Sequence, residues 1–502
     1  MGTFWGKSSM VFWILVYVIL VYFSLDHIFF WDTVQLASKQ AHHFYEGNMY
    51  NFLLPDAIDS GHLPFMGWML AWAWKIMGKT LLISHLVMVP WLVLLIVQVH
   101  CFSKKVVSDS WAPILASLLL LDPTLMAQGS LISPDVILMG GFFLALNGIW
   151  SKQRKLIFSG AILCVLASNR GAMVVGALLV WQFYLNWTDG RKHLGSYLST
   201  LWPYLPAAGL FLTFQIYHYW SKGWIGYHDQ SPWAASFAGV TGLQFLKNMA
   251  IIGWRLLDFG RWFLGLIVFI GLLKWRHRLS KDEILIKLFF LLVFLSFFLL
   301  PSMVLHTGLT GHRYLLPLIV TLLVITVRMV FLLQNGRYKI LTIISLGLSL
   351  FTGNYWIYPK GVAQGWDASL AHWPYFELRS QMNQYLDQHQ ISIRDVGCSF
   401  PNLAEKKYLD LSQSSVSHAN KDLLQNYYFL YSNLYNDISS EDFRLLEREY
   451  KTIHTLEKNG VCLILYQRKK GALLNDLGCA PKVSITMVVS RCWKFKAGCL
   501  VK

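Results

Sequence analysis

About eleven apolar segments, separated by loops with clustered basic residues, constrain this chain more than any other feature. They lie near residues 9–30, 80–102, 111–131, 135–150, 156–169, 171–187, 198–219, 255–273, 284–304, 314–333 and 338–358. Roughly 20 apolar residues are enough for a helix to cross a bilayer. The 502 residues are 55% hydrophobic and only 14% charged, which differs from the usual balance in soluble proteins. The sequence therefore predicts an α-helical polytopic membrane protein.

The distribution of Lys and Arg predicts how the segments are oriented. The formal net charge is +16, and short clusters of basic residues lie at 104–105, 152–155, 191–192, 274–281 and 337–339. All five clusters fall on one side of the predicted topology, which is the cytoplasmic side by the positive-inside rule. The N-terminus is then cytoplasmic, and the chain after about Tyr358 is extracytoplasmic. Because the charge forms no continuous basic face, we expect no nucleic-acid partner.

The composition changes along the chain and predicts three parts. Residues 1–358 form the transmembrane domain, in which 31–79 is an outer loop and Leu63 to Met77 is an interfacial helix. Residues 359–470 combine amphipathic and strand-like stretches, so we expect a small extracytoplasmic α/β domain there. Residues 471–502 form a basic tail with no recognisable pattern. Disulfides and free thiols both fit the five cysteines of these last two parts, Cys398, Cys462, Cys479, Cys492 and Cys499.

The strongest candidate for chemistry is Asp32, which follows Phe29-Phe30-Trp31 at the predicted outer end of the first span. Ionisable groups at membrane depth are costly, about 2.5 to 3.5 kcal/mol on insertion scales, and are often functional. Two interpretations remain open: a reactive carboxylate, or an interfacial Asp that caps the next helix.

Several short motifs occur in order along the first 358 residues and share the predicted outer side. After Asp32 these motifs are His62-Leu63-Pro64, Leu121-Asp122-Pro123, Ser133-Pro134-Asp135, Ser168-Asn169-Arg170-Gly171 and His312-Arg313-Tyr314-Leu315-Leu316-Pro317. The series resembles the GT-C glycosyltransferases, and more narrowly their protein mannosyltransferase and aminoarabinose transferase branch. His62-Leu63-Pro64 has one proline where that branch often has two. The region after residue 430 looks like the tail domain of GT-C-like proteins from Bacteroidetes-type bacteria.

The resemblance implies an inverting glycosyltransferase of a bacterial inner membrane. Its donor would be a sugar on a polyprenyl phosphate, and its acceptor a hydroxyl of a lipid, a protein or a surface glycan at the periplasmic face. Asp32 would be the general base. Cations would bind the donor phosphate, with Arg313 the first choice and His312, Arg170, Arg255 and Arg261 the others.

Other polar residues have open assignments. Asp56, Asp59, His62 and Asp135 are candidates for binding the acceptor or lining the cavity. Asp135 also fits a plain helix N-terminus, and Arg255 and Arg261 also fit local pairs with Asp258 at i, i+3 spacing. No cofactor is expected with certainty. A divalent cation fits the acidic loop, but its residues do not define a metal site.

Two other function classes compete with the transferase. A lipid flippase or other transporter is also polytopic, but transport sites lie near the midplane, often in repeated halves, and the sequence has no internal repeat. An oligosaccharide polymerase or ligase is closer in chemistry. It would be expected to have a long outer loop with clustered Arg between late spans, where this chain has only about Leu305 to Thr310.

Overall fold

The computed structural model describes residues 2–229, 231, 233–359 and 362–469. The predicted basic tail, with Cys479, Cys492 and Cys499, lies outside these residues. The described chain forms two compact units. Unit 1 contains residues 1–356 together with two short returns of the chain, Gly365–Leu370 and Tyr408–Leu411, and unit 2 contains the remaining described residues.

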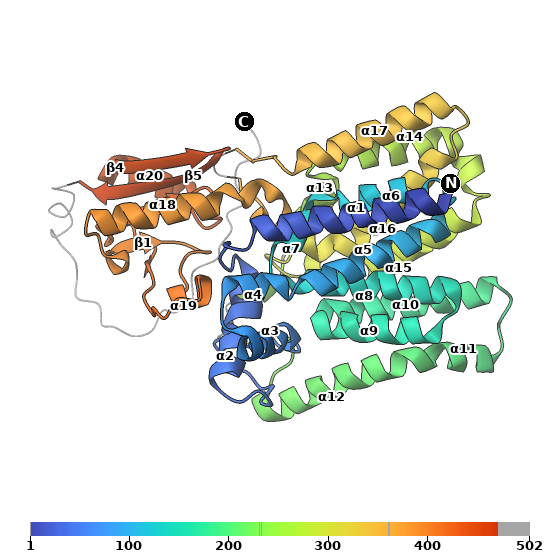
Figure 1. Cartoon of the computed structure of the whole chain (residues 1–502), viewed down its shortest axis with the longest axis horizontal. Helices are drawn as coiled ribbons and strands as arrows, with labels where there is room; N and C mark the ends of the chain where they lie inside the picture. The colour runs from blue at the N-terminus through green and yellow to red at the C-terminus, as the bar shows by residue number, and fades with distance from the viewer. Residues whose placement is uncertain (1, 230, 232, 360–361, 470–502) are drawn as a thin grey trace. The chain divides into compact units, whose positions relative to one another are not determined.

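Unit 1 is helical throughout (Figure 1). Its first half contains α1 (Gly2–Phe23), the π-helix η1 (Val34–Lys39), α2 (Gln40–Glu46), α3 (Phe65–Met77), α4 (Leu81–Leu86), α5 (Val89–Val106), α6 (Ala112–Leu120), α7 (Pro123–Ser130), α8 (Pro134–Ser151), α9 (Arg154–Ala167) and α10 (Asn169–Thr188). Its second half contains α11 (Leu194–Leu201), η2 (Trp202–Tyr204), α12 (Leu205–Lys222), η3 (Ala234–Phe237), α13 (Gly242–Leu257), α14 (Trp262–Leu279), α15 (Glu283–Val304), η4 (His312–Leu315), α16 (Leu316–Phe331), α17 (Gly336–Gly353) and η5 (Trp366–Ala368).

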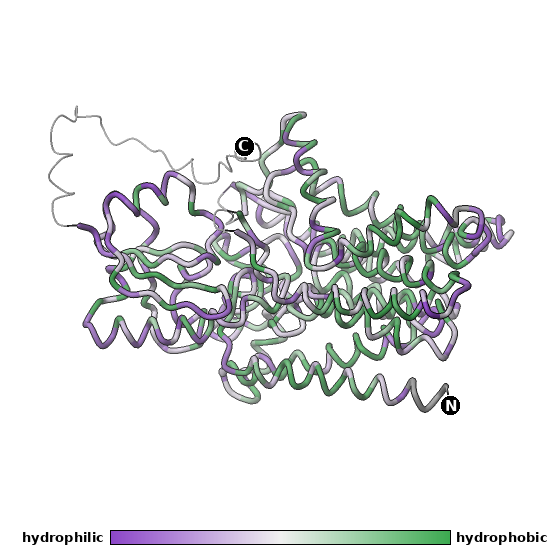
Figure 2. Tube along the Cα trace, turned by 90° about the horizontal axis from the view of Figure 1, so that it is seen from above, coloured by the Kyte–Doolittle hydropathy of each residue, from purple (hydrophilic) through white to green (hydrophobic). Residues whose placement is uncertain are grey.

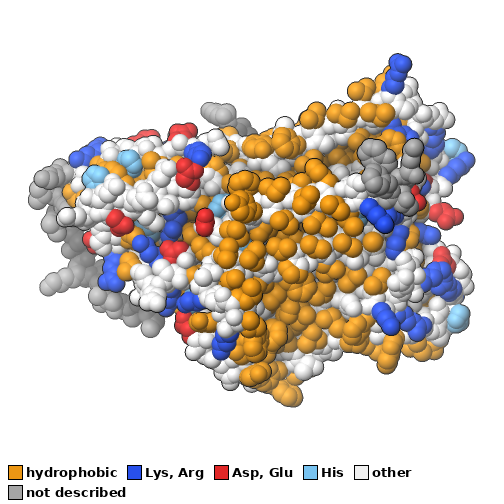
Figure 3. Space-filling model, in the orientation of Figure 1, with side chains coloured by type: hydrophobic (Ala, Val, Ile, Leu, Met, Phe, Trp, Pro, Cys, Tyr) orange, Lys and Arg blue, Asp and Glu red, His pale blue; other side chains and the backbone are white. Residues whose placement is uncertain are grey.

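Fewer helices meet the length and hydropathy needed for a span than the sequence predicted. Among the described residues, four helices do so alone, and the number rises to six if each of two bent pairs is one span; the four are Leu81–Val106, Pro134–Ser151, Glu283–Val304 and His312–Phe331. Eleven spans are therefore not confirmed. Hydrophobic residues follow the helices in Figure 2, and hydrophobic side chains cover much of the face of unit 1 in Figure 3. Such a surface suits contact with lipid.

The two bent pairs break where polar residues interrupt apolar helices. α6 and α7 meet at 64° around Leu121-Asp122, because Asp122 caps the N-terminus of α7 and Pro123 follows it. α13 and the first part of α14 meet at 97° around residues 258–261. Gly260 has a positive φ of 81°, and a Cβ there would lie 1.9 Å from the carbonyl oxygen of Ser349. Only glycine fits at position 260 of this second bend.

Unit 2 is an α/β structure, as the sequence predicted for this region. Three of its helices lie wholly within unit 2: α18 (Pro374–Gln388), η7 (Ile393–Asp395) and α20 (Ser440–Glu449). Two more, η6 (Leu370–His372) and α19 (Lys406–Leu409), include residues of both units, because the chain passes from one unit to the other within them. The sheet order is β2-β1-β3-β5-β4, with β1 (Val396–Cys398), β2 (Ala419–Asn420), β3 (Tyr428–Ser432), β4 (Tyr450–Lys458) and β5 (Val461–Arg468).

The sheet combines both strand directions. β1 runs parallel to β2 and β3, whereas β5 is antiparallel to β3, with Leu430 opposite Leu465, and to β4. Asn459 and Gly460 join β4 to β5, and both have positive φ, as the tight turn of a hairpin requires. Cys398 is a buried free thiol, so the free-thiol alternative holds for this cysteine.

Candidate active site

Arg313 binds three carboxylates at once and forms the centre of the site. Its Nε lies 3.0 Å from Oδ2 of Asp367, and its Nη1 lies 3.1 Å from Oδ2 of Asp135. Its Nη2 donates to Oδ2 of Asp32. Each guanidinium nitrogen thus has its own carboxylate, and each carboxylate comes from a different part of the chain. We call these four residues the carboxylate cluster.

Helix ends bring the cluster together. Asp32 follows Trp31, which has a positive φ of 54°, in the turn between α1 and η1. Asp135 lies in the first turn of α8, where the Ser133 hydroxyl accepts from its backbone N–H. Arg313 lies in η4, at the start of the apolar helix α16. Two of these residues therefore begin candidate spans, which places the cluster at one end of the apolar helices.

Arg170 extends the cluster. Its Nη2 donates to Oδ1 of Asp135 at 2.8 Å, and its Nη1 donates to the backbone oxygen of Arg313 at 3.3 Å. The guanidinium groups of Arg170 and Arg313 lie 4.4 and 4.8 Å from the ring centre of Tyr314. The aromatic ring is thus shared by two cations, and Asp135 is shared by the same two.

The third carboxylate, Asp367, comes from the short return Gly365–Leu370, which we call the strap. Two hydrogen bonds hold the strap on α7: Gln128 donates to the backbone oxygen of Asp367 at 2.7 Å, and Thr124 donates to that of Ala368 at 3.2 Å. Burial, opposed by Arg313 and reinforced by the charges of Asp32 and Asp135, raises the pKa of Asp367 to about 6. The carboxyl group of Asp367 therefore changes its charge near pH 6.

A buried ion pair joins the two helix bends next to the strap. Arg261 donates from Nε and Nη2 to the two oxygens of Asp122, at 2.6 and 2.7 Å, and also to the hydroxyl of Thr124. Both charged side chains are fully buried. Arg261 was expected at the donor phosphate, but these bonds make it a support for α7, which carries the strap.

Asp258, in the second bend, interacts with two of the predicted cations. His312 Nε2 lies 2.7 Å from Oδ2 of Asp258, and Arg255 Nη1 lies 3.7 Å from the same oxygen. The predicted local pair with Asp258, at i, i+3 spacing, therefore forms for Arg255. Arg261 forms its ion pair with Asp122 instead. The side chain of Arg255 is 12% exposed, so part of it remains accessible.

The acidic loop between α2 and α3 forms a separate polar group. The Oδ2 atom of Asp59 lies 3.1 Å from His218 Nε2 and 3.3 Å from Lys222 Nζ, and Asp56 lies 2.5 Å from Lys222. Burial alone would raise the pKa of Asp59, but the hydrogen bonds from His218 and Gly61 and the charge of Lys222 lower it. These bonds tie the loop to α12.

His62 lies beside α10, where its Nδ1 accepts from the backbone N–H of Asn169 at 3.4 Å. Burial and the nearby positive charge of Arg170 lower the pKa of His62 to about 4, against the hydrogen bond to Asn169. The imidazole is therefore neutral near pH 7. A neutral imidazole with an acceptor at Nδ1 carries its proton on Nε2, which can donate to a hydroxyl.

The structure gives the predicted residues four locations. Asp32, Asp135 and Arg313 belong to the carboxylate cluster, and Arg170 lies beside it. Arg255, Arg261 and His312 lie at the adjoining bend, Asp56 and Asp59 lie in the loop group, and His62 lies beside α10. Asp32 does not cap η1, whose N-cap residue Thr33 makes no side-chain cap bond either. Sequence reasoning missed Asp367, because it falls in the region expected to belong to the tail domain.

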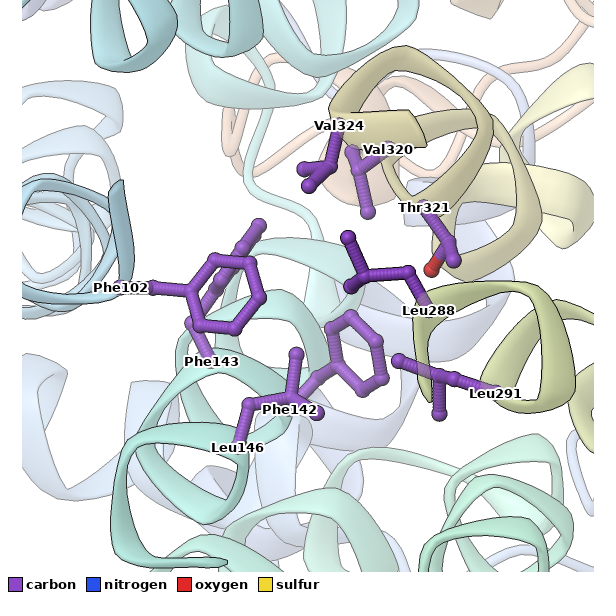
Figure 4. Close-up of a pocket in the computed structure, with 9 residues that line it drawn as sticks. All are labelled: Phe102, Phe142, Phe143, Leu146, Leu288, Leu291, Val320, Thr321 and Val324. Atoms are coloured by element: carbon purple, nitrogen blue, oxygen red, sulfur yellow. The ribbon is translucent and has the colours of Figure 1, made fainter. Parts of the chain in front are cut away.

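Within the described residues, no group of three or more His, Cys, Asp or Glu is arranged to hold a metal ion. The apolar pocket of Figure 4 is also separate from the site. Its lining residues are Phe102, Phe142, Phe143, Leu146, Leu288, Leu291, Val320, Thr321 and Val324, and they leave no room for a water molecule. This pocket belongs to the packed core between α5, α8, α15 and α16.

Comparisons with known proteins give two structural matches. No protein-family model and no curated protein matches the sequence. The chain is similar to the crystal structure of ArnT from Cupriavidus metallidurans bound to undecaprenyl phosphate, with a TM-score of 0.49 and 11% identity, covering 91% of this chain and 97% of that one. The apo structure of the same protein gives a TM-score of 0.47 at 11% identity, with 91% and 98% covered. Scores below 0.5 at this identity do not assign the chain to a family.

Proposed function

We propose that this chain is an inverting glycosyltransferase of the GT-C type. It moves a sugar from a polyprenyl-phosphate donor to an acceptor hydroxyl at the outer face of a bacterial inner membrane. The observation that carries the proposal is the carboxylate cluster at one end of the apolar helices, where a carboxylate base and fixed cations lie together. A lipid-linked donor suits this position, because its tail stays in the bilayer while its headgroup reaches the rim.

Asp32 is the general base in this proposal. Its side chain is 18% exposed, compared with 2% for Asp135 and 9% for Asp367, so it is the cluster carboxylate that an acceptor reaches most easily. The acceptor oxygen attacks C1 of the sugar while the bond between C1 and the phosphate oxygen breaks. The hydroxyl proton goes to Asp32, and the polyprenyl phosphate leaves with the bonding electron pair. Positioned proton transfer of this kind contributes about 10² to 10⁴ in rate.

Arg170 and Arg255 are the best donor-phosphate ligands in this proposal. Their side chains are 18% and 12% exposed, whereas that of Arg313 is 5% exposed and that of Arg261 is fully buried. A phosphate needs N–H groups that it can reach, and guanidinium groups bind it through paired donors. The cation first expected at the phosphate, Arg313, has all three nitrogens bound to carboxylates, so it is better suited to orienting Asp32.

Transfer from a panel of radiolabelled polyprenyl-phosphate sugars, catalysed by the purified protein in lipid with membrane extract as acceptor, tests the proposal. We expect label to move from one donor to an acceptor, and Asp32→Asn to abolish the transfer. Asp189→Asn is a matched control. Asp189 is partly exposed, and within the described chain its only ion pair is with Arg191. Absence of transfer with every donor, together with movement of donor across the bilayer, would support the transporter class instead.

A further inference from the structure

The geometry points to Asp367 as a positioning residue of the transferase site: it shares Arg313 with Asp32 and so sets how firmly Arg313 holds the base. This inference rests on the proposed function and adds a residue of the strap to it. The inference concerns Asp367 alone, because the other cluster residues were already expected from the sequence.

Asp32 and Asp367 compete for the guanidinium group of Arg313. Asp135 has a second cationic partner in Arg170, at 2.8 Å. Among the described residues, Asp32 and Asp367 each form a direct ion pair with Arg313 and with no other residue. Asp32 contacts Nη2 of Arg313, and Asp367 contacts Nε. Because one positive charge is divided between these two carboxylates, a change in the charge of one alters the hold on the other.

The strap leaves Asp367 little freedom to move away. Trp366 is 2% exposed, and Ala368 and Ser369 are fully buried. The bonds from Gln128 and Thr124 fix the backbone at Asp367 and at the next residue, Ala368. Gln128 also accepts from Ser133, the cap of the helix that carries Asp135. The strap and Asp135 are therefore positioned by the same side chain.

Within the described residues, charged and titratable groups reach Asp367 from several elements. Asp32 comes from the turn after α1, Asp135 from α8 and Arg170 from α10, and η4 contributes Arg313 and Tyr314. Arg255 on α13 interacts with Asp367 electrostatically but pairs with Asp258. His312 lies near the strap, since a Cβ at Gly365 would be 2.8 Å from its Nδ1. α7 contributes only neutral groups, Thr124 and Gln128.

The charge of Asp367 has a defined effect in this arrangement. When Asp367 is ionised, Arg313 is divided among three carboxylates, and Asp32 keeps more of its capacity to accept a proton. When Asp367 is protonated, Arg313 concentrates on Asp32 and Asp135, and Asp32 becomes a weaker base. The change occurs near pH 6, where Asp367 titrates.

The test compares the transfer rate of the wild-type protein and Asp367→Asn in lipid at saturating donor from pH 5 to pH 8. The Asn variant has the low-pH charge at every pH. We expect its rate to be about tenfold or more below wild type at pH 8 and close to wild type at pH 5. Asp367→Glu should restore the pH dependence. Asp387→Asn, on the exposed side of α18, is the control for general effects of charge removal.

Three outcomes separate the inference from the proposed function. The ratio of the wild-type transfer rate to the Asp367→Asn transfer rate is the quantity to follow. A ratio that falls toward one at low pH supports the positioning role. A ratio that stays constant with pH, whether near one or large, overturns it, because loss of packing alone does not follow the titration of one group. Absence of transfer by the wild-type protein with every donor refutes the proposed function itself.

Discussion

Arg313 donates from Nη2 to the carboxylate of Asp32, a residue that lies 281 positions earlier in the chain. The contact joins the turn after the first helix to the start of α16. An ion pair of this kind is costly to bury, and its members are held by further bonds: Arg313 also contacts Asp135 and Asp367. The predictions below follow from this shared arginine and from the pairs around it.

Arg313→Lys should lower both transfer and stability. A lysine ammonium is a compact charge without the planar fork that reaches three carboxylates, so at least one of them loses its partner. We expect transfer to fall about 100-fold, within the usual range for a misplaced base. Arg328→Lys is the matched control on the same helix, because Arg328 pairs with Asp282 away from the cluster. If Arg328→Lys lost transfer to the same extent, Arg313 would have no special role.

Arg261→Ala should destabilise the protein, whereas Arg255→Ala should weaken donor binding. Removing Arg261 leaves Asp122 charged and fully buried, which costs about 3 to 5 kcal/mol. The unfolding temperature in detergent measures this loss.

Arg255 is 12% exposed, and its contact with Asp258 is long at 3.7 Å, so its removal should lower the unfolding temperature less than Arg261→Ala does and should raise the donor KM. The reverse pattern, with Arg261→Ala affecting KM alone, would show that the two arginines have exchanged roles.

Asp367→Asn should make the protein more stable at neutral pH while it loses activity. The pKa of Asp367 is raised from 3.8 to about 6, so the fold favours the protonated form. The stabilisation from protonation is fully present below the unfolded pKa and is lost as the pH rises through about 6. Keeping the group neutral removes a penalty of at most about 3 kcal/mol at pH 7.5.

The unfolding temperatures of the wild type and Asp367→Asn, measured at pH 7.5 and pH 4, check this prediction. The variant should unfold at a higher temperature at pH 7.5, and the difference should shrink at pH 4. A less stable variant at both pH values would mean that the ion pair with Arg313 outweighs the cost of burying the charge.

The bond between Asp59 and His218 should hold the acidic loop on α12 except at low pH. The pKa of Asp59 is lowered from 3.8, so its contribution is present above that value and is lost as the pH falls through the folded pKa. Hydrogen exchange of residues 54–62 should therefore stay slow from pH 7 to pH 5, after correction for intrinsic rates. His218→Ala should speed the exchange at pH 7. Unchanged exchange in this variant would show that the bond between Asp59 and His218 does not hold the loop.

The helical bundle and several site residues could be predicted from the sequence because their signals are local. Apolar length predicts helices, and Ser133-Pro134 predicts the start of α8 with Asp135 in its first turn. The α/β character of unit 2 follows from amphipathic and strand-like stretches. The number of spans does not follow in the same way, because the bend at Asp122 and the bend at Gly260 each interrupt an apolar run.

The partners of the charged residues could not be predicted, because they depend on long-range contacts. Arg261 has Asp258 at the favourable i, i+3 spacing but pairs with Asp122, 139 positions away, since the two helix bends meet there. Asp367 has no local motif at all. Its position depends on the strap returning to unit 1 after the chain has already entered unit 2, and no periodicity predicts such a return.

Donor binding and transfer, measured on the same samples of wild-type and Asp32→Asn protein in lipid, test the role of Asp32 most directly. We expect Asp32→Asn to bind the polyprenyl-phosphate sugar with a Kd within about threefold of wild type and to transfer it at least about 100-fold more slowly. Transfer by Asp32→Asn at the wild-type rate would contradict the assignment of Asp32 as the base.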